Sequence, residues 1–175
     1  MSTIVFFHAH PDDEALSTAG TMALLSESGN RVILVVATRG EEGEPVPGVL
    51  KEGELLEERR TKELIKSADL LGVERVEFLN YRDSGMIGSP STSNPECFWQ
   101  AHVEEASLRL ADLLFEETVD LLVIYDPNGG YGHPDHIQVH RVGTFWADQV
   151  GLKNIRWTTL NRDSIKKTIE LAMET

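Results

Sequence analysis

The sequence predicts an α/β fold: a doubly wound, mostly parallel sheet of about five strands flanked by helices. Apolar runs of strand length alternate along the chain with longer amphipathic segments, which is the order expected of a parallel sheet covered on both faces. The 175 residues are 41% hydrophobic, enough to build a core. Because no repeat or linker divides them, we expect a single domain over residues 1–175.

Each expected element follows from a run of residues in this alternation. The strands are short apolar runs between polar or turn residues, as buried parallel strands are. We expect strands at 4–7, 32–36, 75–79, 119–125 and 154–159, and helices at 13–28, 52–71, 98–117, 134–149 and 162–173. In the first helix, Leu16, Ala19 and Ala23 have helical spacing and predict its buried face.

Two histidine–aspartate motifs follow two of these strands. HPDDE occupies residues 10–14, after the first strand, and GHPDH occupies residues 132–136, after the fourth. In the Rossmann-like strand order 3-2-1-4-5 those strands are neighbours, and ligands bind at their carboxyl ends, where the order reverses. We therefore expect the two motifs to meet in one crevice.

The aspartates of the first motif have two interpretations. A helix that begins at Asp12 or Asp13 offers free backbone donors, so either residue could be only an N-cap. His10 and the matching second motif weaken that interpretation. Since consecutive aspartates point in different directions, one can bind a metal while the other acts as general base on the bound water.

A histidine–aspartate–histidine set with open positions suits a divalent metal. Catalytic zinc commonly has three protein ligands and a water molecule. Two histidines and one carboxylate also hold Fe(II) for oxygen chemistry, so Fe²⁺ or another divalent ion is an alternative to zinc. The extra carboxylate and histidine favour hydrolysis. Because no glycine-rich GxGxxG motif follows the first strand, we exclude a nicotinamide or flavin enzyme.

The other histidines have less specific signals. His136 and His140 are four residues apart and could share a helix face, but the glutamate of a HExxH metalloprotease is absent. We expect His140 to support the site or lie on the surface, His8 to neighbour the site, and His102 to be exposed. The glycines around Tyr131 form either a plain turn or a flexible support that brings this side chain over the site.

Composition excludes several classes of partner. The net charge of −13 argues against binding to nucleic acid or to an anionic membrane surface. Cys97 is the single cysteine, so no intrachain disulfide forms. With no signal-peptide pattern and no apolar run long enough to span a bilayer, we expect a soluble, cytoplasmic protein.

The motifs together resemble the LmbE/PIG-L family of metal-dependent N-acetylglucosaminyl deacetylases. The resemblance rests on AHPDDE at 9–14 and GHPDH at 132–136, and on TRGEEG at 38–43 and RxxE at 60–63. YRDSGM at 81–86 and YDPNGGY at 125–131 are most similar to the mycothiol branch, which contains a deacetylase and an S-conjugate amidase.

The resemblance implies a role for each matching residue. It makes zinc the cofactor and assigns its ligands to His10, Asp13 and His136. Asp12 would be the general base. His133 would be the general acid or would stabilise the oxyanion, assisted by Tyr131. Glu14 would support the ligands. Arg60, with Arg59 as the alternative, and Asp83 would hold sugar hydroxyls.

The expected substrate is therefore a small glycoconjugate, an N-acyl glucosamine with N-acetyl as the expected acyl group, cleaved at its amide. A non-catalytic metal- or sugar-binding module on the same fold is the alternative. Members of the mycothiol branch are longer, so either this is a short member or the chain lacks a C-terminal extension. A homo-oligomer is left open.

Overall fold

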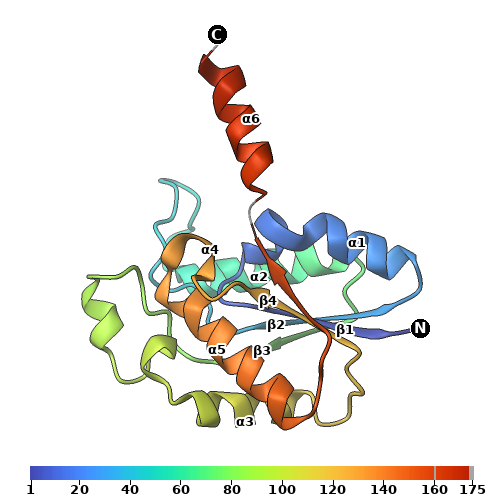
Figure 1. Ribbon diagram of the computed structural model, residues 1–175. Helices are drawn as coiled ribbons and strands as arrows, with labels where there is room; N and C mark the ends of the chain where they lie inside the picture. Colours follow the sequence, from blue (N-terminus) through green and yellow to red (C-terminus); the bar gives the residue numbers. More distant parts are fainter. Residues whose placement is uncertain (160, 174–175) are drawn as a thin grey trace.

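The computed structural model describes residues 1–159 and 161–173. It confirms the doubly wound α/β fold: five parallel strands form one sheet in the order β3-β2-β1-β4-β5. Figure 1 shows this sheet between two layers of helices. The strands are β1 (Thr3–His8), β2 (Arg31–Val36), β3 (Arg75–Phe78), β4 (Leu121–Tyr125) and β5 (Ile155–Thr158).

Alternate residues of each central strand enter cores on opposite faces. Val5 and Ile33 pack on one face with the helices at 103–113 and 134–149, whereas Phe6 and Leu34 pack on the other face with the helices at 19–27 and 56–70. The longer helices are α1 (Ala19–Glu27), α2 (Leu56–Leu70), α3 (Val103–Leu113), α5 (Pro134–Gln149) and α6 (Arg162–Met173). The shorter turns are η1 (Glu14–Thr18), η2 (Pro90–Ser93), η3 (Phe98–Gln100) and α4 (Gly129–Gly132).

The helix expected at 13–28 is split, and its predicted buried face is partly wrong. It begins with a π-helical turn, η1, and continues as α1. A π-turn holds an extra residue and therefore rotates the positions that follow. Leu16, inside this turn, is 83% exposed, and Met22 of α1 is the residue fully buried against the sheet.

The helix expected at 98–117 is also interrupted. Phe98 begins the single turn η3, and α3 does not start until Val103. The break lies where the Ala101 carbonyl accepts a hydrogen bond from Gln138 Nε2 at 2.7 Å. A contact with α5 thus replaces the next helical bond. The buried Phe98 ring packs edge-on against Phe7 of β1.

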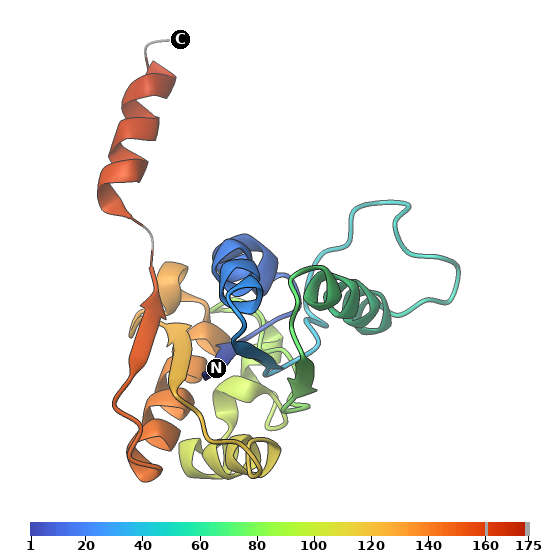
Figure 2. The same cartoon turned by 90° about the vertical axis from the view of Figure 1, so that its right-hand side faces the viewer.

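Both motifs lie at the carboxyl edge of the sheet. HPDDE follows β1 directly, and α4 and α5 follow β4, its neighbour in the sheet. This is where the strand order reverses, as predicted. α6 projects away from the sheet and its flanking helices (Figure 2), and its residues are exposed. Within the described residues, no helix is long and apolar enough to cross a membrane.

Candidate metal centre and active site

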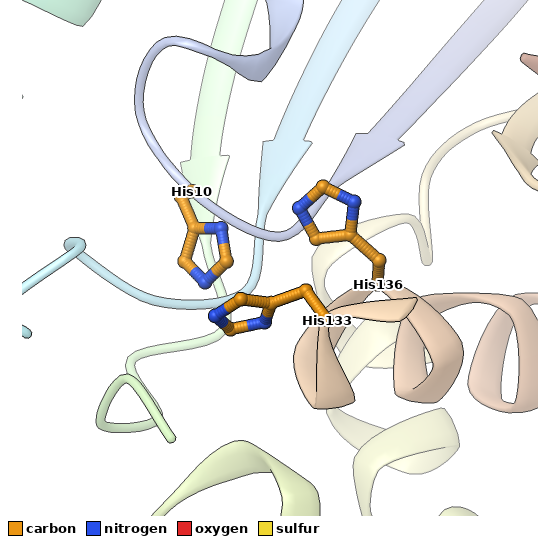
Figure 3. Close-up of side chains that lie close together, drawn as sticks. All are labelled: His10, His133 and His136. Carbon is orange, nitrogen blue, oxygen red and sulfur yellow. The ribbon is translucent and has the colours of Figure 1, made fainter. Parts of the chain in front are cut away.

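Three buried histidines meet at the carboxyl edge of the sheet (Figure 3). His10 comes from the segment after β1, and His133 and His136 come from the start of α5. Their rings are 4.6 to 5.4 Å apart between centroids. One ring nitrogen of each lies within 4.8 Å of those of the other two. The two motifs, more than 100 residues apart in the sequence, therefore form one site.

Asp13 lies between two of these histidines. Its Oδ2 is 3.4 Å from His10 Nδ1, and its Oδ1 is 3.3 Å from His136 Nε2. Two ligands of one tetrahedral zinc ion, each bonded at about 2.0 to 2.1 Å, are separated by roughly 3.3 to 3.4 Å. Each of these two pairs is therefore spaced like two ligands of one ion, and together they are the set that the resemblance implied. The groups of described residues whose ligand atoms all lie within 4.8 Å of one another are His10, His133 and His136, and His10, Asp83, His133 and Asp135.

The Nε2 atom of His136 is a buried polar atom without a hydrogen-bond partner among the described residues. It approaches Asp13 Oδ1, but the geometry is not that of a hydrogen bond. Buried polar atoms are rarely left unpaired. A cation between this nitrogen and the carboxylate would satisfy both. The ring of His136 is held in place by Tyr125, which stacks on it at 4.1 Å and 13°.

The Nε2 atom of His10, on the side of the ring away from Asp13, faces two carboxylates. It lies 3.2 Å from Asp135 Oδ2 and 3.5 Å from Asp83 Oδ1. Asp135 is fully buried and accepts hydrogen bonds from the backbone N–H (3.0 Å) and the hydroxyl of Ser84. Carboxylates commonly orient metal-binding histidines in this way and leave the opposite nitrogen for the metal. The site thus presents His10 Nδ1 toward Asp13.

The charges of these groups are strongly coupled. Burial alone would lower the pKa of His10, but Asp13, Asp135 and Asp83 raise it well above the ordinary value. Burial alone would raise the pKa of Asp13, but His10 and His136 hold it well below the usual range. Asp83 is lowered in pKa in the same way, mainly by His10. The carboxylates therefore carry negative charge, which attracts a cation.

His133 has a defined tautomer in its neutral form. Its Nδ1 accepts the backbone N–H of Asp135 at 3.1 Å, so the ring proton is on Nε2. Burial, together with the neighbouring His10, lowers the pKa of His133 to about 4. A neutral imidazole that presents an N–H donates a hydrogen bond. This arrangement favours stabilisation of an oxyanion over a permanently charged general acid.

Asp12 is more exposed than Asp13 and has unusual backbone geometry. Its side chain is 56% exposed, and its φ of +121° lies in a region that favours glycine. Partial burial raises the pKa of Asp12, and the Arg60 guanidinium opposes that rise.

Neither Asp12 nor Asp13 caps the helix through its side chain. The first helical turn has no side-chain cap hydrogen bond, and Asp13 Oδ2 accepts the backbone N–H of His10 at 2.8 Å.

Arg60 of α2 contacts the base candidate. Its Nη2 donates to Asp12 Oδ2 at 2.8 Å and to the Pro11 carbonyl at 2.6 Å, and its Nη1 donates to the Gly40 carbonyl at 2.7 Å. The family resemblance implied that Arg60 and Asp83 hold sugar hydroxyls. Both lie at the site, but Arg60 is engaged by Asp12, whereas its neighbour Arg59 pairs with acids of its own helix region.

Tyr131 lies over the histidines, on the turn α4. Its ring is 65% exposed and stands 4.9 Å from the ring of His136 and 6.1 Å from that of His133. Gly129 begins this turn with a φ of +63°, and a Cβ there would lie 2.8 Å from the Cβ of His136. Glycine therefore allows α4 to pack directly on a metal-ligand candidate.

The remaining histidines lie outside the ligand set. His8 is fully buried, and its ring nitrogens contact the Tyr125 hydroxyl (2.8 Å) and Thr18 Oγ1 (2.9 Å). It therefore neighbours the site through Tyr125, as predicted. His140 Nδ1 bonds to the Tyr125 carbonyl at 3.0 Å and does not share the site with His136. His102 is exposed.

Sequence reasoning missed several residues around the site. Asp135 could have been predicted, because it lies within the GHPDH motif. Carboxylates are common hydrogen-bond partners of metal-binding histidines. Ser84, Tyr125 and Ser67 offered no signal, because a serine or tyrosine in a loop, strand or helix is ordinary. Their roles depend on contacts between distant segments.

The fold and the site define an α/β protein with a buried cluster of histidines and carboxylates at the strand-order switch. The chain belongs to the PIG-L family, described as GlcNAc-PI de-N-acetylase, which matches residues 5–147. This confirms the family that the motifs predicted.

Curated relatives agree with the predicted branch. Over 148 residues, the chain is 48% identical to a 1D-myo-inositol 2-acetamido-2-deoxy-alpha-D-glucopyranoside deacetylase from Thermomonospora curvata, covering 79% of this chain and 50% of that protein. A second deacetylase of this name, from Thermobifida fusca, is 48% identical over 149 residues, or 79% and 52% of the two chains. The chain thus spans about half the length of these relatives.

Among solved structures, the N,N'-diacetylchitobiose deacetylase from Pyrococcus horikoshii is similar, with a TM-score of 0.66 and 28% identity. The match covers 84% of this chain and 49% of that chain. Fold similarity by itself does not define the reaction.

Proposed function

We propose that the protein is a zinc-dependent hydrolase that cleaves the amide of an N-acyl glucosamine conjugate. Its substrate on this proposal is N-acetylglucosaminyl-inositol or a related mycothiol-type conjugate. The observation that carries the proposal is the placement of Asp13 between His10 and His136, with the unpaired nitrogen of His136 beside it. The names of the relatives support the choice of substrate.

The metal in this proposal is held by His10, Asp13 and His136. When bound, zinc would polarise the amide carbonyl and lower the pKa of a bound water. Fe²⁺ or another divalent ion with the same preference for nitrogen and oxygen ligands is an alternative occupant. We also propose that residues 1–175 act as a single domain and that the protein is cytoplasmic.

The chain's own residues divide the proton transfers. Asp12 takes the proton from the attacking water and passes it to the leaving nitrogen, so that the amine departs as the amide C–N bond breaks; its raised pKa suits both transfers. His133 donates its Nε2–H to the developing oxyanion, with Tyr131 beside it. Asp83 and Arg60 contact the sugar hydroxyls. On this account, Arg60 must give up part of its hydrogen bonding to Asp12 when the substrate binds, and contact the sugar instead.

A substrate panel tests this function. Zinc-loaded protein is incubated with N-acetylglucosaminyl-inositol, other N-acetylglucosamine conjugates and a mycothiol S-conjugate, and free amine and released acid are measured. We expect amine and acetate in equal amounts from N-acetylglucosaminyl-inositol. Release of a larger acid from the S-conjugate would instead indicate the amidase. Tight zinc binding with no amine from any member would favour a non-catalytic binding module.

A further inference from the structure

We propose that Glu14 is a positioning residue that fixes the conformation of Asp12, acting through the backbone N–H of Asp12 and supported by Ser67 of α2. The inference rests on the proposed function, in which Asp12 is the general base. It assigns a purpose to a buried carboxylate that binds neither metal nor substrate in that mechanism.

Glu14 is nearly inaccessible and has two specific partners. It is 1% exposed. Its Oε2 accepts the backbone N–H of Asp12 at 3.0 Å, and its Oε1 accepts the hydroxyl of Ser67 at 2.7 Å. Within the described residues, no lysine, arginine or histidine forms an ion pair with it. A buried acid without a cation is costly, so packing alone does not explain it.

The residue that Glu14 holds is strained. Asp12 and Asn80 are the non-glycine residues with positive φ in the described part of the chain. Such geometry persists only where the surroundings enforce it, and it is frequent at active sites. The Asp12 carbonyl is held by the N–H groups of Ala15 and Leu16, both at 3.0 Å, so Glu14 supplies the restraint on the other side of the Asp12 α-carbon.

Arg60 shares this restraint only in part, because its Nη2 donates to the Pro11 carbonyl of the same peptide unit at 2.6 Å but also reaches the side chain. It binds the Asp12 carboxylate itself, the group that must be free to accept a proton. Glu14 instead holds the main chain, so its hydrogen bond does not occupy a carboxylate oxygen of Asp12. Ser67 links this contact to α2, the helix that also carries Arg60. The backbone conformation of Asp12 is thus fixed by Glu14, and Glu14 is held in turn by Ser67 of α2.

Substitutions at Glu14 test the proposal. We expect Glu14→Ala to lower kcat about 10- to 100-fold, the usual effect of removing an outer partner at a metal site, with KM and bound zinc little changed. Glu14→Gln keeps an oxygen acceptor for the Asp12 N–H and should recover most of the turnover. Ser67→Ala should have a smaller effect in the same direction. The exposed Glu58→Gln on α2 is the matched control.

A double-mutant cycle separates positioning from general stability. If Glu14 acts through Asp12, Glu14→Ala causes no further loss of kcat in an Asp12→Asn background. If Glu14→Ala does not fold, Ser67→Ala is used in the same cycle. An equal loss of kcat in both backgrounds would overturn the proposal, as would a Gln variant as impaired as the Ala variant. An Asp12→Asn protein with normal turnover would instead refute the proposed base.

Discussion

Asp13 is the residue that turns two histidine motifs into one centre. It contacts His10 from its own motif and His136 from the other, at distances that suit two ligands of a single ion. Because His10 and Asp13 are only three residues apart, the first motif supplies two of the three proposed ligands. The second motif needs to contribute one further nitrogen.

His8 makes the stability of the metal-free protein depend on pH. Burial lowers the pKa of His8 from 6.5 to about 4. Between those values the unfolded chain binds a proton that the folded chain excludes, so stability falls as the pH falls from 6.5 toward 4. The full difference is on the order of 3 kcal/mol. We expect His8→Gln to show a shallower decline in this range.

Chemical unfolding of metal-free wild type and His8→Gln at a series of pH values between 7 and 4 provides the measurement. Metal-free protein is required because loss of a bound ion on acidification would add its own pH dependence. Identical slopes in the two proteins would show that His8 does not carry this linkage.

At the residue scale, the sequence could predict those side chains whose residue type alone suggests metal binding. Histidines and aspartates in paired motifs indicate a metal, and the structure brings His10, Asp13 and His136 together. The contact of Arg60 with Asp12 could not be predicted, because it depends on how α2 lies against the segment after β1. Nor could Ser84 be found, since its importance comes only from Asp135.

The short turn α4 and the start of α5 act as one structural unit around the site. α5 begins at Pro134, and His133 caps it by accepting the Asp135 N–H. One helical turn therefore sets the direction of both His133 and His136. Gly129 lets α4 pack against the backbone of α5 at this point.

A pair of glycine substitutions tests that packing. Gly129→Ala and Gly130→Ala both place a Cβ at positive φ, which costs about 1 to 3 kcal/mol of stability. Only at Gly129 does the new Cβ meet His136 and Ile137, both at 2.8 Å, whereas nothing lies within 4 Å at Gly130. We therefore expect weaker zinc binding in Gly129→Ala alone. Equal zinc affinity in the two variants would contradict this role.

Element boundaries were predictable where local signals agreed. The helix expected at 134–149 matches α5, because Pro134 is a favourable first residue and its capping histidine precedes it. The helices expected at 13–28 and 98–117 were interrupted by a π-turn and by the Gln138 contact, respectively. Neither feature is visible in hydrophobic spacing.

At the scale of the whole molecule, the strand order creates the site. Parallel strands β1 and β4 are neighbours although they are separated by more than 100 residues, so their carboxyl ends deliver both motifs to one crevice. The alternation of strands and helices predicted this order. The substrate is less constrained, because the chain spans about half the length of its curated relatives.

Metal content and turnover measured on the same samples test the central claim most directly. Wild type, Asp12→Asn and His136→Ala are loaded with zinc, dialysed and assayed for acetate release from N-acetylglucosaminyl-inositol. We predict that Asp12→Asn retains one zinc ion and loses about 10²- to 10⁴-fold in kcat, as removal of a general base does. His136→Ala should lose both zinc and activity. Normal turnover by zinc-loaded Asp12→Asn, or full zinc content in His136→Ala, would contradict the account.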